Sequence, residues 1–308
     1  MHKFSRHILI ILVLVIAFST AFGQGKRRSN SRWKQNRYDL IFGLGGTGFL
    51  GDLGGANAVG TNFVRDLEYT MTRPLGSLGI RYKVLENVAV RYDMVFGYLR
   101  GDDKLTNDPA RNTRNINVRT PIFETSLVGE FSITRERMGS IYNLRKVRGL
   151  RGIKSNIFLF AGVAGFYFNP QGKYTDGKWY ALQPLGTEGQ GIVPTRKPYS
   201  RIGFAIPVGV GLKYAFNRKW SIGFDYGVRK AFTDYLDDTS TTYVNNGVIE
   251  SVNGPIAAHF ADPSLGAFPG AQTGGVQRGD DIDDDAYMFL KITLTYKMRN
   301  SRSGMPKF

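Results

Sequence analysis

The side chains most often used for catalysis are scarce in this chain of 308 residues. Its three histidines are His2, His7 and His259, and the first two lie in an N-terminal segment with the features of an export signal. His259, left alone in an expected loop, gives neither a Ser-His-Asp site nor a histidine-ligated zinc site. We therefore expect no catalytic residue, no metal site, no cofactor and no small-molecule substrate.

An acidic run near the C-terminus is a candidate cation site. It consists of Asp280, Asp281, Asp283, Asp284 and Asp285. Carboxylates are the ligands that calcium prefers, but the run lacks the spacing of an EF-hand loop. We interpret it as part of a solvated loop.

A glycine motif near the start of the chain has two incompatible interpretations. Gly43, Gly45 and Gly48 form G-x-G-x-x-G after an apolar run, and Asp66 follows about 20 residues later, as in a dinucleotide-binding fingerprint. That site requires a helix to begin at the third glycine, whereas FLGDLGG at residues 49–55 is a poor helix former. Residues 38–45 also alternate with the period of a strand. One face holds Tyr38, Leu40, Phe42 and Leu44, and the other holds Asp39, Gly43 and Gly45.

The N-terminal segment predicts export. A basic start, an unbroken apolar run over residues 8–18 and the small-x-small site at 21–23 are typical of a cleaved signal peptide, residues 1–23. A membrane-anchoring helix is the alternative, although the run is short for a span. The chain has no Cys, so it is neither a lipoprotein nor stabilised by disulfides.

Long stretches of period-2 alternation predict the rest of the fold. Residues 24–37 form a basic arm, residues 38–298 the folded domain and residues 299–308 a basic tail. Within the domain we expect eight strands and no intervening helix. They cover about 38–49, 74–84, 88–98, 120–134, 157–168, 201–216, 220–232 and 285–298.

The chemistry of the two strand faces distinguishes a soluble barrel from a membrane barrel. One face carries the bulkiest side chains, and the other mixes glycine and alanine with charged residues. Eight strands enclose a bore just wide enough for side chains to fill, so the bulky face would overfill it. We therefore predict an all-β, antiparallel, eight-stranded transmembrane β-barrel of the outer membrane, with its apolar face in lipid. A soluble periplasmic β-protein is the alternative.

The face with the small residues is then the bore. We expect its charged residues to pair with one another and close it, and the glycines of residues 43–48 to leave space for Arg91 and Glu124. The predicted network in the bore consists of Arg81, Arg91, Asp93, Glu124, Glu130, Asp225, Arg229 and Lys291.

Loop lengths and charge predict the orientation. The short connections at 86–87 and 217–219, the connection at 135–156 and both termini share one side, which we assign to the periplasm. The arm carries +6, the connection at 135–156 has seven basic residues and Glu136 for +6, and the tail carries +3. The long loop at 233–284 on the opposite side carries nine acids and Arg278 for −8. The predicted long extracellular loops thus contrast with a basic periplasmic face.

We expect this basic face to bind an acidic periplasmic partner. Nucleic acid is not a candidate partner because export removes the chain from it. A solubilising surface, or an anchor to anionic headgroups, is the alternative. The predicted partner-binding residues are Arg135, Arg137, Arg145, Lys146, Arg148, Arg151 and Lys154.

Several short motifs resemble those of a known family. These are Tyr38 with the glycine strand, GDLG at 51–54, GDD at 101–103, Arg114-Asn115, and the pair Glu124 and Glu130. They are similar to the small outer-membrane barrels of Bacteroidetes typified by PorG, with the PorP/SprF barrels as a neighbouring possibility. The similarity covers the first four strands; the second half agrees in general pattern, and the long loop at 233–284 departs from a compact barrel.

The resemblance implies a component of the type IX secretion and gliding machinery. In that machinery the barrel ties a periplasmic ring, built from a lipoprotein and a soluble partner, to the outer membrane. The resemblance brings no catalytic residues. A passive structural or adhesive barrel, or a narrow pore, remains the alternative function.

Overall fold

The computed structural model describes residues 32–51, 53, 71–105, 109–134, 155–217, 219–280, 284–300 and 306–307. The expected signal peptide, most of the basic arm, the connection at 135–154 and Asp66 lie outside these residues. So do two members of the acidic run, Asp281 and Asp283. No helix within the described ranges is both long and apolar enough to cross a membrane.

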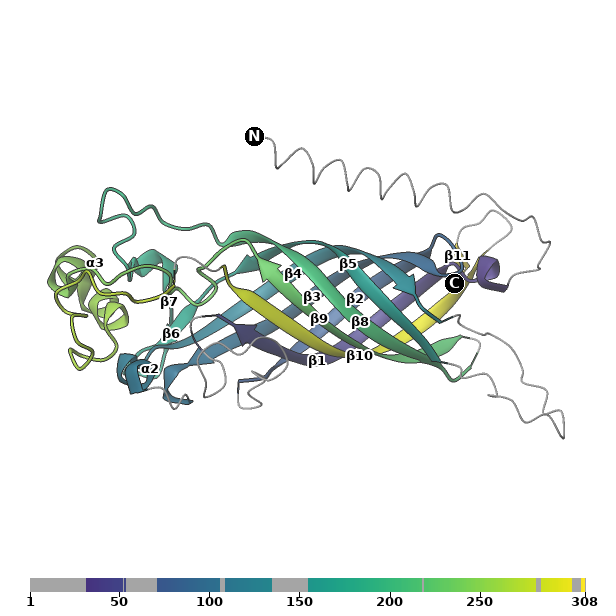
Figure 1. Ribbon diagram of the computed structural model, residues 1–308, viewed down its shortest axis with the longest axis horizontal. Helices are drawn as coiled ribbons and strands as arrows, with labels where there is room; N and C mark the ends of the chain where they lie inside the picture. Colours follow the sequence, from purple (N-terminus) through teal and green to yellow (C-terminus); the bar gives the residue numbers. More distant parts are fainter. Residues whose placement is uncertain are drawn as a thin grey trace. The chain divides into compact units, whose positions relative to one another are not determined.

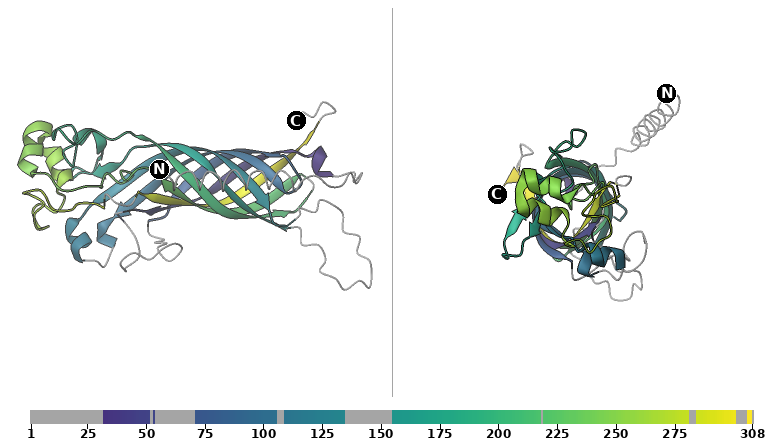
Figure 2. Two further views of the ribbon diagram at one scale, coloured as in Figure 1. Left: turned by 45° about the horizontal axis from the view of Figure 1, so that its top comes forward. Right: turned by 90° about the vertical axis from the view of Figure 1, so that its left-hand side faces the viewer.

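Eight antiparallel strands close into a barrel, which confirms the predicted fold class (Figure 1). Each strand pairs with its neighbour in the order β3-β2-β1-β10-β9-β8-β5-β4, and pairing of β3 with β4 completes the ring. The end-on view in Figure 2 shows this ring. The strands are β1 (Tyr38–Leu50), β2 (Arg73–Lys83), β3 (Val88–Asp102), β4 (Asn117–Ser132), β5 (Ser155–Phe168), β8 (Ile202–Ala215), β9 (Trp220–Ala231) and β10 (Ala286–Asn300).

Strand directions sort the connections between two ends. We call basal the end at which β1 begins, β10 ends, and β2–β3, β4–β5 and β8–β9 connect. The 3₁₀ helix η1 (Arg32–Gln35) and the short strand β11 (Pro306–Lys307), which pairs with the end of β10, belong to this end. The opposite end, which carries the longer connections, is the cap end.

The outer surface of the barrel is apolar along its middle. On β3, Val90, Tyr92, Met94 and Phe96 point outward and are exposed, whereas Arg91 and Asp93 between them are buried. The same alternation runs along β8. A belt of exposed bulky side chains around a polar interior is the pattern of a barrel in lipid, the reverse of a soluble one.

The cap end is a folded structure, which the sequence did not predict. Residues 102–117, 169–201 and 233–285, which we call the cap, contain several short elements (Figure 1). These are η3 (Asp103–Leu105), α2 (Pro109–Arg114), β6 (Gln171–Lys173), β7 (Trp179–Ala181), η4 (Gln183–Leu185) and α3 (Asn246–Ala261). The loop expected at 233–284 therefore holds a helix, kinked at Gly254, where φ is +84° and Pro255 follows.

The main apolar core lies inside the cap half of the barrel and continues into the cap. Phe49, Leu99 and Ile122 from the strands pack with Leu182 and Phe260 of the cap. Strands β3 and β4 extend beyond their predicted ends to form part of this core. Above the outer apolar belt, the inward faces of these strands are therefore apolar, as in a soluble protein.

Candidate functional site

The bore of the barrel contains all eight charged residues predicted to face it, each at most 3% exposed. Their alternation on β2, β3, β4, β9 and β10 directs them inward. Because charges without counter-ions are costly in such an environment, their pairing determines what the bore can do.

Glu130 is the centre of the basal group of charges. Its carboxylate accepts from Arg81 Nε at 2.6 Å and lies 3.0 Å from Arg91 and 3.3 Å from Lys213. Asp39 adds a second carboxylate, 3.4 Å from Arg81 and 3.3 Å from Lys83. One carboxylate therefore joins three cations contributed by three different strands.

Arg91 extends this group toward the middle of the bore. Its guanidinium lies 3.0 Å from Asp93 and 2.6 Å from Asp225, and Lys291 lies 3.2 Å from Asp93. Six of the eight predicted residues thus form one connected network. Glu124 and Arg229 form a separate pair at 3.3 Å, in which Tyr287 also donates to Glu124 at 2.9 Å.

Aromatic rings fill the space beside these charges, and the sequence did not predict them there. Bulky strand residues as a class were expected to face lipid, but Phe158 and Phe160 are buried in the bore. The Phe158 ring lies 4.2 Å from Lys213 Nζ, and the Phe160 ring 5.1 Å from the Arg91 guanidinium. These are cation–π distances, so the rings stabilise the network while blocking the bore.

Glycines create the space for these rings, on strands other than the one expected. A Cβ at Gly211 would lie 2.1 Å from the Phe158 ring, and one at Gly209 2.4 Å from the Phe160 ring. On β1, a Cβ at Gly43 would meet Ser77, and one at Gly45 the Leu290 carbonyl. The expectation that the β1 glycines make room for Arg91 and Glu124 is therefore wrong.

A second buried polar cluster lies in the cap. Arg278 donates to Glu188 at 3.0 Å and to the Asp238 carbonyl at 2.6 Å. The Asp238 carboxylate accepts from Thr187 and Tyr199, both at 2.5 Å. Burial raises the pKa of Asp238 to about 6, against the ordinary 3.8.

Other candidate chemistry is limited. His259, the one histidine in the described residues, packs edge-on against Tyr174 at 4.9 Å, and burial lowers its pKa. Across the part of the chain that the structure describes, no three His, Cys, Asp or Glu side chains are grouped so that they could hold a metal ion.

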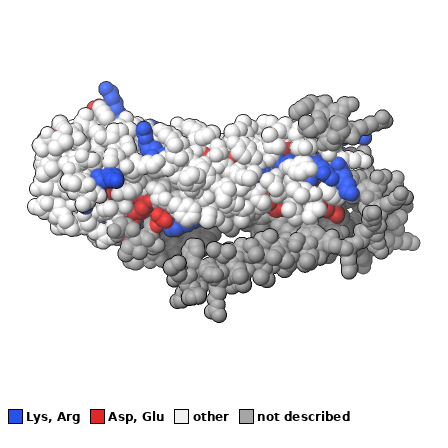
Figure 3. All heavy atoms as spheres, turned by 90° about the horizontal axis from the view of Figure 1, so that it is seen from above, with Lys and Arg blue, Asp and Glu red and all other residues white. Residues whose placement is uncertain are grey.

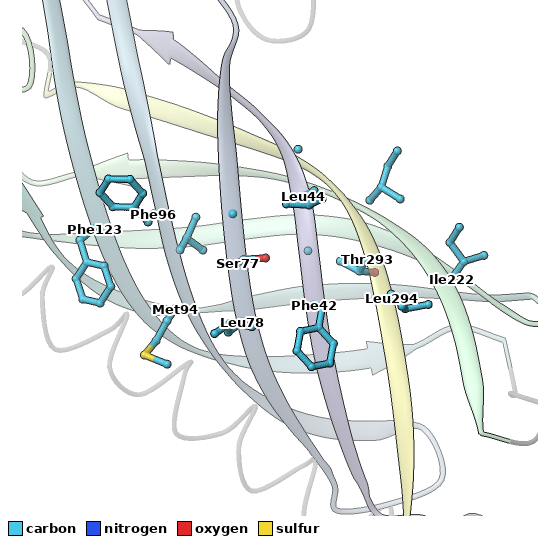
Figure 4. A pocket seen from close by; sticks show the side chains of 15 residues that line it. Phe42, Leu44, Ser77, Leu78, Met94, Phe96, Phe123, Ile222, Thr293 and Leu294 are labelled. Atoms are coloured by element: carbon cyan, nitrogen blue, oxygen red, sulfur yellow. The ribbon is translucent and has the colours of Figure 1, made fainter.

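An apolar hollow lies on the outside of the barrel, over β1, β2, β3 and β10 (Figure 4). Phe42, Leu44, Leu78, Met94 and Phe96 are among its lining side chains. Because these residues belong to the outer apolar belt, the hollow suits hydrocarbon chains.

The predicted partner-binding residues Arg135, Arg137, Arg145, Lys146, Arg148, Arg151 and Lys154 lie outside the described residues. The connection that carries them leaves β4 at Ser132 and enters β5 at Ser155, both at the basal end. Figure 3 shows basic side chains toward both ends of the barrel and few charges along its middle.

No protein-family model and no curated protein matches the chain. Solved structures that resemble it are outer-membrane proteins. Ail, the attachment invasion locus protein of Yersinia pestis, is 9% identical; the match covers 85% of this chain and 98% of Ail, with a TM-score of 0.37. OprG of Pseudomonas aeruginosa is 10% identical over 86% of this chain and 98% of its own, with a TM-score of 0.37. The outer-membrane enzyme PagL is 12% identical over 84% and 99%, with a TM-score of 0.29. Similarity at this level carries no argument about function.

Proposed function

We propose that the protein is a non-enzymatic outer-membrane anchor that binds an acidic periplasmic partner through its basal end. The observation that best supports this role is the filled bore. Ion pairs around Glu130 and Arg91, the Phe158 and Phe160 rings and the apolar core follow one another along it. A barrel closed in this way is suited to holding something in place and not to passing solutes.

The distribution of charge favours the basal end as the binding surface. The arm, the connection at 135–156 and the tail together carry +15, from +6, +6 and +3, and all three join the barrel at that end. The loop at 233–284, at the cap end, carries −8. A concentrated basic surface attracts and orients acidic partners. We assign the basal end to the periplasm because the longer connections of such barrels are extracellular.

The partner we propose is the periplasmic ring of the type IX secretion and gliding machinery, formed by a lipoprotein and a soluble protein. The support for this identity is the motif resemblance on the first four strands. The general anchoring role rests on the closed bore and the charge, so it does not depend on this identity.

Co-purification from the native envelope tests the anchoring role. Replacing Arg145, Lys146, Arg148 and Arg151 by Gln removes four charges at the basal end, and we expect the periplasmic partner to be lost from the purified complex. A matched variant should retain the partner. It replaces four exposed lysines of the cap by Gln, namely Lys104, Lys173, Lys178 and Lys197. Heat-dependent gel migration verifies that both barrels are folded.

Co-purification of the partner with the basal variant at the wild-type level would contradict the anchoring role. Loss in both variants would indicate general electrostatic attraction and not a docking surface. Identification of the co-purified proteins by mass spectrometry tests the ring assignment separately.

Recognition at the cell surface is the second candidate function. It is favoured by the cap, which folds around its own buried residues Ile249, Ala257 and Ala261 and therefore presents a defined surface. Under this alternative, the cap lysine variant loses adhesion of whole cells to a surface, while the basal variant adheres normally.

A further inference from the structure

Two arginines face each other on the outside of the barrel, near the cap end. Arg100 on β3 and Arg119 on β4 are directly opposite in the strand register. Both belong to the outward-facing set of their strands. Like charges in directly opposite positions destabilise a sheet, so this arrangement calls for a bound anion or another compensation.

Neighbouring side chains hold the two guanidiniums in place but leave them incompletely bonded. Arg100 lies 3.2 Å from Asp102. Arg119 donates to Gln171 at 2.8 Å and lies 4.2 Å from the Trp179 ring, both contributed by the β6–β7 hairpin of the cap. The Nε–H groups of both arginines are buried and have no hydrogen-bond partner within the described structure. One acidic neighbour for two cations leaves a net positive charge.

The pair lies at the level expected of lipid headgroups. Outward residues of β3 are apolar or aromatic from Val88 to Tyr98, and Arg100 is the next outward position. Eleven residues on a tilted strand span a hydrocarbon layer about 25 Å thick. On β4, which runs in the opposite direction, Phe123 and Pro121 are likewise the outward residues between the middle of the belt and Arg119. The arginines therefore mark the end of the belt at which phosphate groups lie.

The apolar hollow lies below the pair, toward the basal end. Phe96 and Phe123, which line it, are opposite each other in the register, four residue pairs below Arg100 and Arg119, and Tyr98 and Pro121 are the outward-facing pair between them. Both rings are visible at one side of the hollow in Figure 4. Gly76 lies between Leu44 and Phe96 in the register, and a Cβ added there would meet no atom within 4 Å. The missing side chain leaves space on the outer surface for a hydrocarbon chain.

We infer that Arg100 and Arg119 clamp a phosphate group of an outer-leaflet lipid whose acyl chain occupies the hollow over Gly76. Arginine suits this task because its planar guanidinium forms paired, charge-assisted hydrogen bonds to phosphate oxygens. The inference goes beyond the proposed function and requires no periplasmic partner.

Native mass spectrometry of the full chain in non-ionic detergent tests the lipid clamp. The probes are lipid A, phosphatase-treated lipid A and inorganic phosphate. We expect lipid A to bind the wild type at least about tenfold more tightly than an Arg100→Gln/Arg119→Gln variant, because charge-assisted hydrogen bonds are lost. The phosphatase-treated lipid should bind both proteins equally weakly.

A matched control replaces Arg201 and Lys230 by Gln, which removes two basic residues at the cap end of β8 and β9, and should bind lipid A normally. Gly76→Leu fills the hollow, so it should weaken the binding of lipid A without changing the binding of inorganic phosphate. If the arginine variant does not fold, as judged by heat-dependent gel migration, this glycine variant carries the test.

Equal binding of lipid A by the wild type and the folded arginine variant would overturn the clamp. Inorganic phosphate bound as tightly as lipid A would show a phosphate site with no lipid component. Lipid A binding by Gly76→Leu at the wild-type level would show that the acyl chain does not occupy the hollow.

Discussion

At the residue scale, Glu130 is the central counter-ion of the charged residues in the basal half of the bore. Its carboxylate forms ion pairs with Arg81, Arg91 and Lys213. Glu130→Gln keeps the shape of the side chain but leaves these buried cations short of one counter-ion. We expect a loss of about 3 kcal/mol in the free energy of unfolding, measured by urea titration of tryptophan fluorescence in lipid vesicles.

The exposed Glu86, in the β2–β3 turn, provides the control for Glu130. Glu86→Gln makes the same chemical change in water, where single charges contribute little, so we expect a change below about 0.5 kcal/mol. Equal effects of the two substitutions would contradict the role assigned to the Glu130 network.

Asp238 makes the stability of the cap depend on pH. Its folded-state pKa of about 6 lies above the ordinary 3.8 because burial disfavours the charged carboxylate. A raised carboxyl pKa gives a contribution to stability that is complete below the unfolded-state pKa and is lost as the pH rises through about 6. The difference between these two pKa values corresponds to at most about 3 kcal/mol in the free energy of unfolding.

Asp238→Asn should remove this dependence while retaining the left-handed backbone (φ +62°), which Asn tolerates. Hydrogen exchange of the cap amides at pH 5 and pH 7.5, corrected for intrinsic rates, provides the measurement. We expect the wild-type cap to be less protected at pH 7.5, relative to the variant, than at pH 5. All other groups of the cap are the same in both proteins, so the difference between the two isolates Asp238. A constant difference would contradict the prediction.

At the element scale, β5 and β8 are matched to each other in shape. The rings of Phe158 and Phe160 occupy space that Gly211 and Gly209 leave empty. We expect Gly211→Ala to cost about 1 to 3 kcal/mol in the free energy of unfolding, because the new methyl group overpacks the bore.

A double-mutant cycle checks this match. Phe158→Leu should recover part of the stability lost in Gly211→Ala, since the two side chains are in contact. Gly76→Ala provides the control, because a Cβ there meets nothing within 4 Å. Strictly additive effects of Gly211→Ala and Phe158→Leu would show that the ring and the glycine are not coupled.

The eight barrel strands could be predicted because lipid imposes a strict period of two. Val88 to Tyr98 on β3 shows this most clearly, and the inward charges follow from the same alternation. This alternation of apolar outward and charged inward residues indicates a strand only within the part of the barrel that lies in the membrane. Above it, Leu99 and Val118 face inward to an apolar core, while Arg100 and Arg119 face outward. This reversal resembles an irregular loop in the sequence, so the extended ends of β3 and β4 were not predicted.

The cap cluster could not be predicted for a different reason. Glu188, Asp238 and Arg278 are separated by tens of residues along the chain and lie in segments with no period. The inward position of Phe158 was missed because β5 is apolar on both faces. Only the glycines opposite on β8 indicate which face points into the bore.

At the scale of the whole molecule, the bore is closed twice. The cap and the apolar core close it at one end, and the network of Arg81, Arg91 and Glu130 with the Phe158 and Phe160 rings closes it independently toward the basal end. Removing one closure therefore leaves the other in place.

We expect no ion conductance in planar bilayers from the wild type, and none after residues 234–284 are replaced by a short Gly-Ser linker. The deletion removes Leu236 and Phe260 from the apolar core, but the ion pairs around Arg91 remain. Adding Phe158→Ala and Phe160→Ala to the deletion opens space beside those ion pairs, and this combined variant should leak ions while either change alone does not. Conductance in the deletion variant alone would show that the cap is a gate over an open bore, and a sealed combined variant would show that the ion pairs suffice without the rings.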